Sequence, residues 1–544
     1  MRDLILYSML ITGVLISCAP HVPPQQPDDA PLASIPPSRS THLVEEIVDK
    51  SFDYQIKQIL DLPRQVRRLV GKPYEALDVD AYDEVHNSSW FTQRIGYETF
   101  SPEQIRRGPN RSTGPDTTGL WTVLSLKTAG VTPGMTIVDA RGDRYIIKFD
   151  PPAYAELASA TEVIATRLLH ASGYNVPENY IAYLNPERLV PGDNARLALA
   201  KADKRPARAK RPLTREDLQL IVARANPSGA KRVRVLASRF LPGRPIGPWP
   251  YIGVRTGDAN DRYPHEHMRA LRSLYVIASW LNHADMKEEN TLDIFDENTR
   301  TVRHYLIDFG AAMGSNSTGP SNPRRGQANS FDLKDSLLRL FTLGLYVPAY
   351  ERAQKTVHFS SIGYVQNELF NPGAWKPMYP NPAFENLTQR DAFWGARIAT
   401  AFSNAHIRAA VMEGRLSNSD AAAALELFLR QRRDAIGRYW FARTNPLDQF
   451  CATKDSLYFS DLAIDRGFAD AATTHYVYNV TTGAGKKVAT GSTTQRTLVL
   501  MKNWALHEKL IIHLNPERPH MAIAPLRVYL HRRDESWAVG GVSR

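Results

Sequence analysis

Residues 283–290 read His-Ala-Asp-Met-Lys-Glu-Glu-Asn, and the next apolar segment ends in Asp-Phe-Gly at residues 308–310. Two carboxylates, an amide and an ammonium group lie in these two runs: Asp285, Asp308, Asn290 and Lys287. Carboxylate and amide oxygens are ligands that Mg²⁺ accepts, and a lysine offsets the charge of a bound phosphate. The two runs therefore predict a site that handles phosphate together with a divalent cation.

Periodicity places these runs on a helix-loop-strand-strand frame. Residues 267–282 show helical spacing, and residues 291–295 and 302–307 are β-favouring segments around a polar turn. Upstream, the pattern predicts a hairpin, a helix that ends at Gly173 and a further strand, at 135–140, 144–149, 156–172 and 233–241. The first motif thus lies on a loop after a helix, and Asp308 follows a strand.

This order of motifs resembles the protein kinase superfamily, whose catalytic loop has the pattern H-R-D-x-K-x-x-N and precedes D-F-G. Every position matches except Ala284, which replaces the usual arginine. The resemblance covers about residues 120–440 and implies an α+β, two-lobed protein-kinase-like fold with ATP in the cleft between the lobes. It also implies a role for each motif residue. Asp285 would orient the acceptor hydroxyl, Lys287 would offset charge, and Asn290 and Asp308 would hold Mg²⁺. His283 would support the loop.

Two further residues complete the implied nucleotide site. Lys148 lies on the predicted strand 144–149, where the family carries the lysine that binds phosphate. Its partner would be a glutamate of the following helix, and we favour Glu162 over Glu156. Glu156 is in the first turn, where the helix dipole already explains an acidic residue.

The chain also departs from the family pattern. The G-x-G-x-x-G loop is missing, and residues 126–134 stand in its place with Lys127, Gly130 and Gly134. Their backbone N–H groups could approach phosphate, although an ordinary turn also explains this stretch. The A-P-E segment is absent too, and residues 311–332 instead contain the pair Arg324-Arg325. The resemblance is therefore better to atypical kinases of the bacterial HipA and spore-coat types and to small-molecule phosphotransferases.

The N-terminus indicates export. Residues 4–16 are apolar, follow Arg2 and are too short to span a bilayer, which is typical of a signal-peptide core. The following Leu-Ile-Ser-Cys resembles a bacterial lipobox, which implies that Cys18 is acylated. An ordinary cleaved signal or a short buried segment is the alternative. The residue after the cysteine is Ala19 rather than Asp, which by resemblance to Gram-negative lipoprotein sorting favours the outer membrane. The catalytic domain would then face the periplasm or the cell surface.

The 544 residues imply more than one packed unit. We expect a signal peptide, a Pro-rich spacer, an N-terminal extension, a kinase-like N-lobe, a kinase-like C-lobe and a β-rich domain, at 1–17, 18–41, 42–119, 120–245, 246–445 and 446–544. Residues 43–69 of the extension have helical spacing, and Asp78, Asp80 and Asp83 are expected in a solvated turn. The net charge of +11 comes largely from a Lys-rich loop, and no nucleic-acid motif accompanies it.

The leading hypothesis is an ATP- and Mg-dependent phosphotransferase that transfers the γ-phosphate to a hydroxyl of an envelope or extracellular acceptor. The acceptor is left open as a protein, a glycan or a small molecule. A nucleotide-binding pseudokinase or an envelope scaffold is the alternative, because a fold does not dictate activity. Scarcity of ATP outside the cytoplasm favours that alternative, whereas the complete set of lysine, metal-binding and base positions favours the enzyme.

Overall fold

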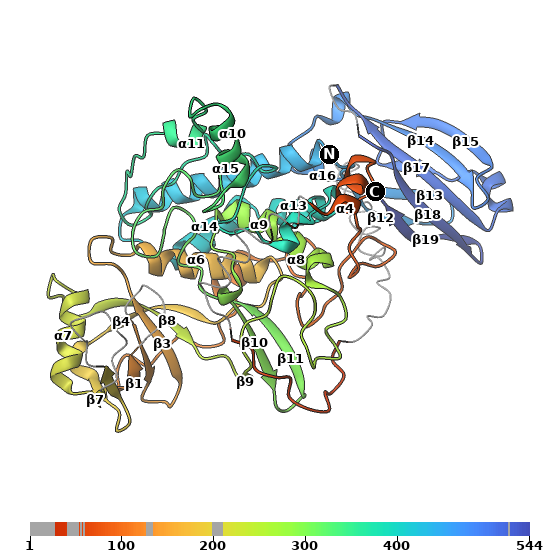
Figure 1. Cartoon of the computed structure of the whole chain (residues 1–544). Coiled ribbons are helices and arrows are strands. Elements are labelled where there is room, and N and C mark those ends of the chain that lie inside the picture. The colour runs from red at the N-terminus through yellow and green to blue at the C-terminus, as the bar shows by residue number, and fades with distance from the viewer. Residues whose placement is uncertain are drawn as a thin grey trace, which may run out of the picture.

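Residues 28–40, 54, 57, 60–126, 134–198, 210–519 and 523–544 are described by the structure, which is a computed structural model. Sheets and helices are both present and largely segregated along the chain, so the predicted α+β class is confirmed. Figure 1 shows a sheet lobe, a helical lobe and a C-terminal β domain. Among the described residues, no helix combines the length and apolar character that crossing a bilayer requires.

The sheet lobe is a six-stranded sheet with the strand order β4-β8-β3-β2-β1-β5. Its strands are β1 (Trp121–Leu126), β2 (Gly134–Val138), β3 (Arg144–Phe149), β4 (Asn179–Leu184), β5 (Leu189–Pro191) and β8 (Val233–Arg239). Burial alternates along β3, so Tyr145, Ile147 and Phe149 enter one core. Lys148 therefore points to the opposite face of the sheet, toward α6 (Leu157–Ala171), where Val163 packs with Ile181 and Leu236.

Residues 185–232 are an insertion between β4 and β8. They contain β5, the small pair β6 (Arg196–Ala198) and β7 (Lys210–Pro212), and helix α7 (Arg215–Ala225). A capping box between Thr214 and Asp217 fixes the start of α7. Strand β5 pairs in parallel with β1, so the insertion extends the sheet at its edge.

The helical lobe is built around three long helices and α9. Its helices are α8 (Arg269–Arg272), α9 (Leu274–Leu281), α10 (Leu333–Phe341), α11 (Ala349–Arg352), α12 (Pro382–Glu385), α13 (Gln389–Ala401), α14 (Asn404–Glu413) and α15 (Ser419–Phe441). The largest apolar core of the described residues fills this lobe and buries Trp280 and Trp394 completely or nearly so. Helix α15 begins at Ser419, but its N-cap is Asn418, whose side chain accepts from the N–H groups of Asp420 and Ala421.

A three-stranded sheet lies beside the motif residues. The hairpin β10 (Thr291–Asp296) and β11 (Thr301–Leu306) pairs with β9 (Arg244–Pro245) in the order β11-β10-β9. The six paired positions of the hairpin run from Thr291 opposite Leu306 to Asp296 opposite Thr301. This register brings residue 290, before β10, and residue 307, after β11, to the same end of the hairpin.

The Pro-rich spacer predicted at 18–41 instead packs against the folded protein over residues 28–40, which we call the strap, and its other residues lie outside the described part of the chain. Leu32 is buried in a small core with Ile246, Phe295 and Val302. Its N–H donates to the carbonyl of Arg300 at 2.9 Å, and Arg39 N–H donates to the carbonyl of Ile246 at 3.0 Å. Sequence periodicity missed this packing because one buried leucine and isolated backbone hydrogen bonds leave no repeating pattern.

In the N-terminal extension, the structure describes α4 (Leu62–Leu69) and α5 (Pro102–Arg107). Most of the predicted helix 43–69 lies outside the described residues, as do the signal peptide, Cys18 and the greater part of the Lys-rich loop. The side chain of Arg64 anchors α4 through the carbonyl of Glu385 (2.5 Å) and Oδ1 of Asn386 (3.2 Å).

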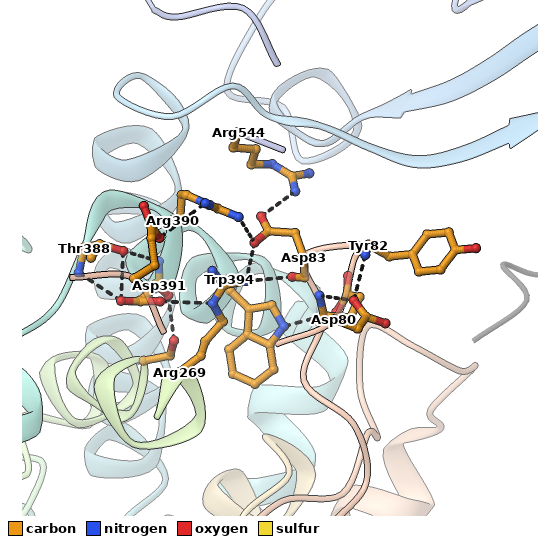
Figure 2. A network of polar contacts seen from close by, with 12 residues as sticks. Asp80, Tyr82, Asp83, Arg269, Thr388, Arg390, Asp391, Trp394 and Arg544 are labelled. Carbon is orange, nitrogen blue, oxygen red and sulfur yellow. Dashed lines mark hydrogen bonds and ion pairs between the residues drawn. The ribbon is translucent and has the colours of Figure 1, made fainter. Parts of the chain in front are cut away.

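The prediction of a solvated turn at Asp78, Asp80 and Asp83 is wrong for Asp83, which is buried. Figure 2 shows Asp83 among three arginines, with ion-pair distances of 2.6 Å to Arg269, 2.8 Å to Arg390 and 3.2 Å to Arg544. Burial opposes ionisation, but the three guanidinium groups outweigh it and hold the pKa of Asp83 below its ordinary value. We call this buried ion-pair cluster of Asp83 with Arg269, Arg390 and Arg544 the buried joint. The sequence did not reveal it, because the three arginines come from distant parts of the chain.

The C-terminal β domain is confirmed as β-rich. Its five-stranded sheet has the order β15-β14-β17-β18-β19, and a second sheet has the order β12-β13-β16. The elements are β12 (Leu447–Ala452), β13 (Ser456–Asp461), α16 (Leu462–Asp465), β14 (His475–Thr482), β15 (Lys487–Thr493), β16 (Thr497–Val499), β17 (Lys509–Glu517), β18 (Leu526–Arg533) and β19 (Ser536–Ser543). Asp448 ties this domain to the helical lobe through Arg397 of α13 at 3.0 Å, and within the domain it also pairs with Arg544 at 3.0 Å.

Candidate active site

Lys148 joins the two lobes. Its Nζ atom lies 2.9 Å from Oδ1 of Asp308 and 3.5 Å from Oε2 of Glu162. Burial alone would lower the pKa of Lys148, but the two carboxylates outweigh burial and raise it above the ordinary lysine value. Lys148 is therefore positively charged at neutral pH. When Glu162 and Asp308 are both ionised, the three groups carry a net charge of −1.

Of the two glutamates weighed from the sequence, the structure places Glu162 beside Lys148. Glu162 lies in the second turn of α6 and is nearly fully buried, and burial raises its pKa while Lys148 opposes the shift. Glu156 is the N-cap of the same helix, with a backbone φ of 71°. Its Oε2 accepts a hydrogen bond from the N–H of Ser417 at 3.0 Å. Glu156 therefore binds the loop between α14 and α15 in the helical lobe and does not pair with Lys148.

The glycine-containing stretch before β2 is described only in part. Gly134 begins β2 and stands opposite Lys148 in the antiparallel register. Lys127 and Gly130 lie outside the described residues. The register places the end of that stretch next to the lysine that would bind phosphate.

Asp285 and Asn290 lie together across the 283–290 loop. The Nδ2 atom of Asn290 donates to the carbonyl of Asp285 at 2.7 Å and to its Oδ2 at 3.1 Å. Lys287 Nζ lies 3.6 Å from the same Oδ2 and 3.6 Å from Oε2 of Glu289. The other oxygen of Asp285, Oδ1, is buried without a hydrogen-bond partner among the described residues. A buried orphaned acceptor needs an explanation, and a donor from a bound ligand provides one.

His283 fixes the 283–290 loop through contacts with the residues before it and after Asp308. Its backbone N–H donates to the carbonyl of Ala278 at 2.8 Å, and its Nδ1 lies 3.3 Å from the carbonyl of Ala311. The imidazole also meets the ring of Phe309 edge-on, with centroids 5.8 Å apart. Burial lowers the pKa of His283, so the neutral ring is favoured. This histidine therefore holds the two motifs together.

Two backbone features fix Asp308 in place. The N–H of Ile307 donates to the carbonyl of Asn290 at 3.0 Å, which connects the ends of the hairpin. Asp308 itself has a φ of 62°, a left-handed conformation that is unusual outside glycine and common at functional sites. At Gly310, an added Cβ would lie 3.1 Å from Oγ of Ser317 and 3.3 Å from Oε2 of Glu162, so the space admits little more than glycine.

The donor set fits Mg²⁺ bound together with a nucleotide. The carboxylate of Asp308 remains 43% exposed despite its contact with Lys148. Asn290 uses its Nδ2 on Asp285, which directs its amide oxygen to the other side of the side chain. No group of three or more His, Cys, Asp or Glu side chains in the described ranges forms a metal cage. Mg²⁺ rarely needs one, because it keeps waters and binds one or two carboxylates plus substrate phosphates.

The structure adds two residues that sequence reasoning did not assign. Ser317 lines a small pocket together with Lys148, Glu162 and Asp308. Arg325 contacts Sδ of Met378 at 3.2 Å, and the N–H of Met378 donates to the carbonyl of Ala284 at 2.7 Å. Arg325 also bonds to the amide oxygen of Asn316.

Arg325 therefore brings a cation close enough to Asp285 for the two charges to interact. Burial lowers its pKa, and the charge of Asp285 acts in the opposite direction. The pair Arg324-Arg325 was the available signal in the sequence. Its placement depends on the return of residue 378 onto the loop, a contact that spacing along the chain does not encode.

Comparisons with known proteins give only distant likenesses. No protein-family model and no curated protein matches the chain. Among solved structures, the chain is similar to a Helicobacter pylori proinflammatory kinase, at 10% identity and a TM-score of 0.31, over 59% of this chain and 99% of the other. It is also similar to the Golgi casein kinase, at 10% identity and a TM-score of 0.29, over 76% and 96%. A structure of the Golgi casein kinase with Mn/ADP bound matches at 12% identity and a TM-score of 0.23, over 69% and 97%. With these scores, the assignment of the site rests on its own geometry.

Proposed function

We propose that this protein is an ATP- and Mg-dependent phosphotransferase, an atypical kinase that transfers the γ-phosphate to a hydroxyl group. The observation that carries the proposal is the position of Lys148 between Glu162 and Asp308. A lysine on a strand, a helix glutamate that holds it and an aspartate after a strand are the parts that bind nucleotide phosphates and Mg²⁺ in protein kinases. Coincidence is a poor explanation for three such residues converging from separate elements.

In this mechanism, Lys148 neutralises phosphate charge and Glu162 fixes the ammonium group. Asp308 and the amide oxygen of Asn290 would hold Mg²⁺, which neutralises the charge that develops on the transferred phosphoryl group. Asp285 accepts the hydrogen bond of the acceptor hydroxyl through Oδ1. As the acceptor oxygen bonds to phosphorus, the bond from phosphorus to the leaving ADP oxygen breaks and the hydroxyl proton passes to Asp285. Lys287 offsets the charge around Asp285, so catalysis is mainly positional and electrostatic.

The location of the enzyme is part of the same proposal. We propose that Cys18 is acylated, that the protein is held at the bacterial outer membrane, and that its acceptor is an envelope or extracellular molecule. The lipobox-like sequence Leu-Ile-Ser-Cys supports this. The mass of the N-terminal peptide from membrane-extracted protein tests it, because acylation adds fatty acyl chains to a peptide that begins at Cys18. A peptide that begins at Met1, or an unmodified Cys18, would contradict the lipid anchor.

The nucleotide site is tested by titrating the protein with ATP in the presence and absence of Mg²⁺. We expect Mg-dependent binding, and we expect Asp308→Ala to weaken it strongly. Glu297→Ala changes an exposed carboxylate in the turn of the β10-β11 hairpin and serves as the matched control. Absence of binding in the parent protein would refute a nucleotide site.

Transfer is tested separately from binding. With labelled ATP and envelope extract, Asp285→Asn should retain nucleotide binding and lose transfer by orders of magnitude. Equal labelling by the parent protein and by Asp285→Asn, or binding with no transfer by either, would favour the pseudokinase or scaffold.

A further inference from the structure

A concentration of exposed apolar side chains lies in the helical lobe, away from the site. It occupies residues 337–347, which cover the end of α10 and the turn that follows, and we call it the apolar tip. Its exposed members are Leu337, Leu340, Phe341, Leu343, Leu345 and Val347. Leu343 is 92% exposed, Leu345 87% and Phe341 79%. Soluble proteins seldom leave such a group of large apolar side chains in water without a binding role.

The tip is ordered and stands away from the body of the protein. The N–H of Gly344 donates to the carbonyl of Arg339 at 2.8 Å, and the hydroxyl of Thr342 donates to the carbonyl of Leu338 at 2.7 Å. An added Cβ at Gly344 would meet nothing within 4 Å. The backbone is thus fixed by its own hydrogen bonds, whereas the side chains of Phe341, Leu343 and Leu345 are left mostly exposed.

The charges around the tip are mainly positive. Residues 333–355 contain four cations and two carboxylates: Lys334, Arg339, Arg352, Lys355, Asp335 and Glu351. Both carboxylates already have a partner. Asp335 accepts a hydrogen bond from the hydroxyl of Tyr350 at 2.7 Å, and Glu351 forms an ion pair with Arg339. Lys334, Arg352 and Lys355 are exposed and have no carboxylate partner in the described part of the chain.

We propose that the apolar tip inserts into the surface of an anionic lipid bilayer. Exposed Leu and Phe side chains flanked by lysine and arginine are the combination that binds the interface of such membranes. The nearly complete exposure of Leu343 and Leu345 suits a deformable lipid surface, because a protein partner would need a matching cavity for both side chains. The proposal concerns a surface outside the phosphotransfer site and does not depend on that activity.

Docking of the tip would also orient the site. Helix α10 begins after its N-cap Asp332, which pairs with Lys376 at 2.5 Å, and the N–H of Ser330 donates to the carbonyl of Met378 at 2.7 Å. These contacts connect the start of α10 to residues 376–378, and the N–H of Met378 donates to the carbonyl of Ala284. A bilayer that holds the tip would therefore be linked to the 283–290 loop through this segment.

The test places a reporter in the tip of the full chain, in a Cys18→Ser background that excludes acylation. Leu343→Trp is compared with Leu506→Trp, because Leu506 is 85% exposed in the C-terminal domain and is far from α10 in sequence. Vesicles of phosphatidylglycerol and phosphatidylcholine carry brominated acyl chains, which quench tryptophan that enters the bilayer. We expect added quenching for Leu343→Trp and none for Leu506→Trp. Equal quenching of the two, or no added quenching while the protein co-sediments with vesicles, would overturn the proposal.

A second measurement separates a lipid surface from a second copy of the chain. The double variant Leu343→Glu/Leu345→Glu should weaken vesicle binding at least about tenfold, because two apolar contacts are replaced by anions. Thermal unfolding should stay unchanged, since neither side chain is packed. If sedimentation velocity instead shows a dimer that this variant dissociates, and vesicle binding is unaltered, the tip is a protein interface and the lipid proposal fails.

Discussion

Arg39 pairs with Glu288 at 2.6 Å and so joins the strap to the 283–290 loop. Glu288 is the first residue of the 3₁₀ turn Glu288–Asn290, and the side chain of Asn290 donates a hydrogen bond to Oδ2 of Asp285. A residue of the predicted spacer therefore contacts the loop that carries the candidate base. The strap therefore contacts the candidate site directly, and a shortened chain that begins after residue 40 would lack this contact.

The first prediction concerns this pair. Arg39→Ala should lower the rate of phosphoryl transfer about three- to tenfold, because a partly exposed ion pair contributes about 1 kcal/mol. A double-mutant cycle with Glu288→Gln, measured as kcat, should give a non-additive term of similar size. Lys454→Ala removes an exposed pair with Glu535 and serves as control. Additive effects of Arg39→Ala and Glu288→Gln would contradict a positioning role.

The second prediction distinguishes the two glutamates weighed for Lys148. Glu162→Gln should reduce nucleotide affinity and kcat by about 100-fold or more, because Lys148 loses the carboxylate that orients it. Glu156→Gln should change kcat less than about threefold, since its carboxylate bonds to the N–H of Ser417. The measurement is steady-state transfer with ATP titration. A larger loss in Glu156→Gln than in Glu162→Gln would refute the assignment.

The third prediction concerns the buried joint in Figure 2. Asp83→Asn should lower the free energy of unfolding by about 3–5 kcal/mol, because the fully buried Arg269 loses its closest ion-pair partner. Glu535→Gln breaks an exposed pair and should cost less than about 1 kcal/mol. Urea unfolding followed by circular dichroism measures both. A cost for Asp83→Asn no larger than that of the control would show that the joint does not stabilise the fold.

The fourth prediction is a pH dependence at His170. Burial, with help from Arg94, lowers the pKa of His170 from 6.5 to about 3. Below pH 6.5 the unfolded chain binds a proton that the folded chain refuses, so this residue destabilises the fold increasingly as the pH falls toward 3. The cost reaches about 1.4 kcal/mol for each pH unit.

The variant His170→Gln removes this titration. Its difference in unfolding free energy from the parent should shift in favour of the variant as the pH falls from 7.5 to 5, as measured by urea unfolding. The exposed and non-titrating residue Gln354 supplies the control Gln354→Ala, for which the difference should stay constant. A constant difference for His170→Gln as well would mean that the folded protein protonates this histidine normally.

Much of the fold could be predicted because it depends on local patterns. β-favouring runs marked β3 and β8, helical spacing marked α9, and a polar turn marked the hairpin β10-β11. Other elements were missed, among them strands β1, β4, β5, β12, β13, β15 and β19 and helices α7 and α14. Weakly patterned strands such as β4, which is buried at five of its six positions, look like generic apolar segments until a partner strand is known.

The sequence by itself determined which residue types the site contains and their order, because loop and strand spacing within residues 283–310 are local properties. Only the tertiary structure decided which distant groups meet. It brought Lys148 to Asp308, Arg39 to Glu288 and Arg544 to Asp83. These contacts join residues more than 150 positions apart. In each pair at least one charged group is largely buried and therefore requires a partner, which the chain supplies from elsewhere.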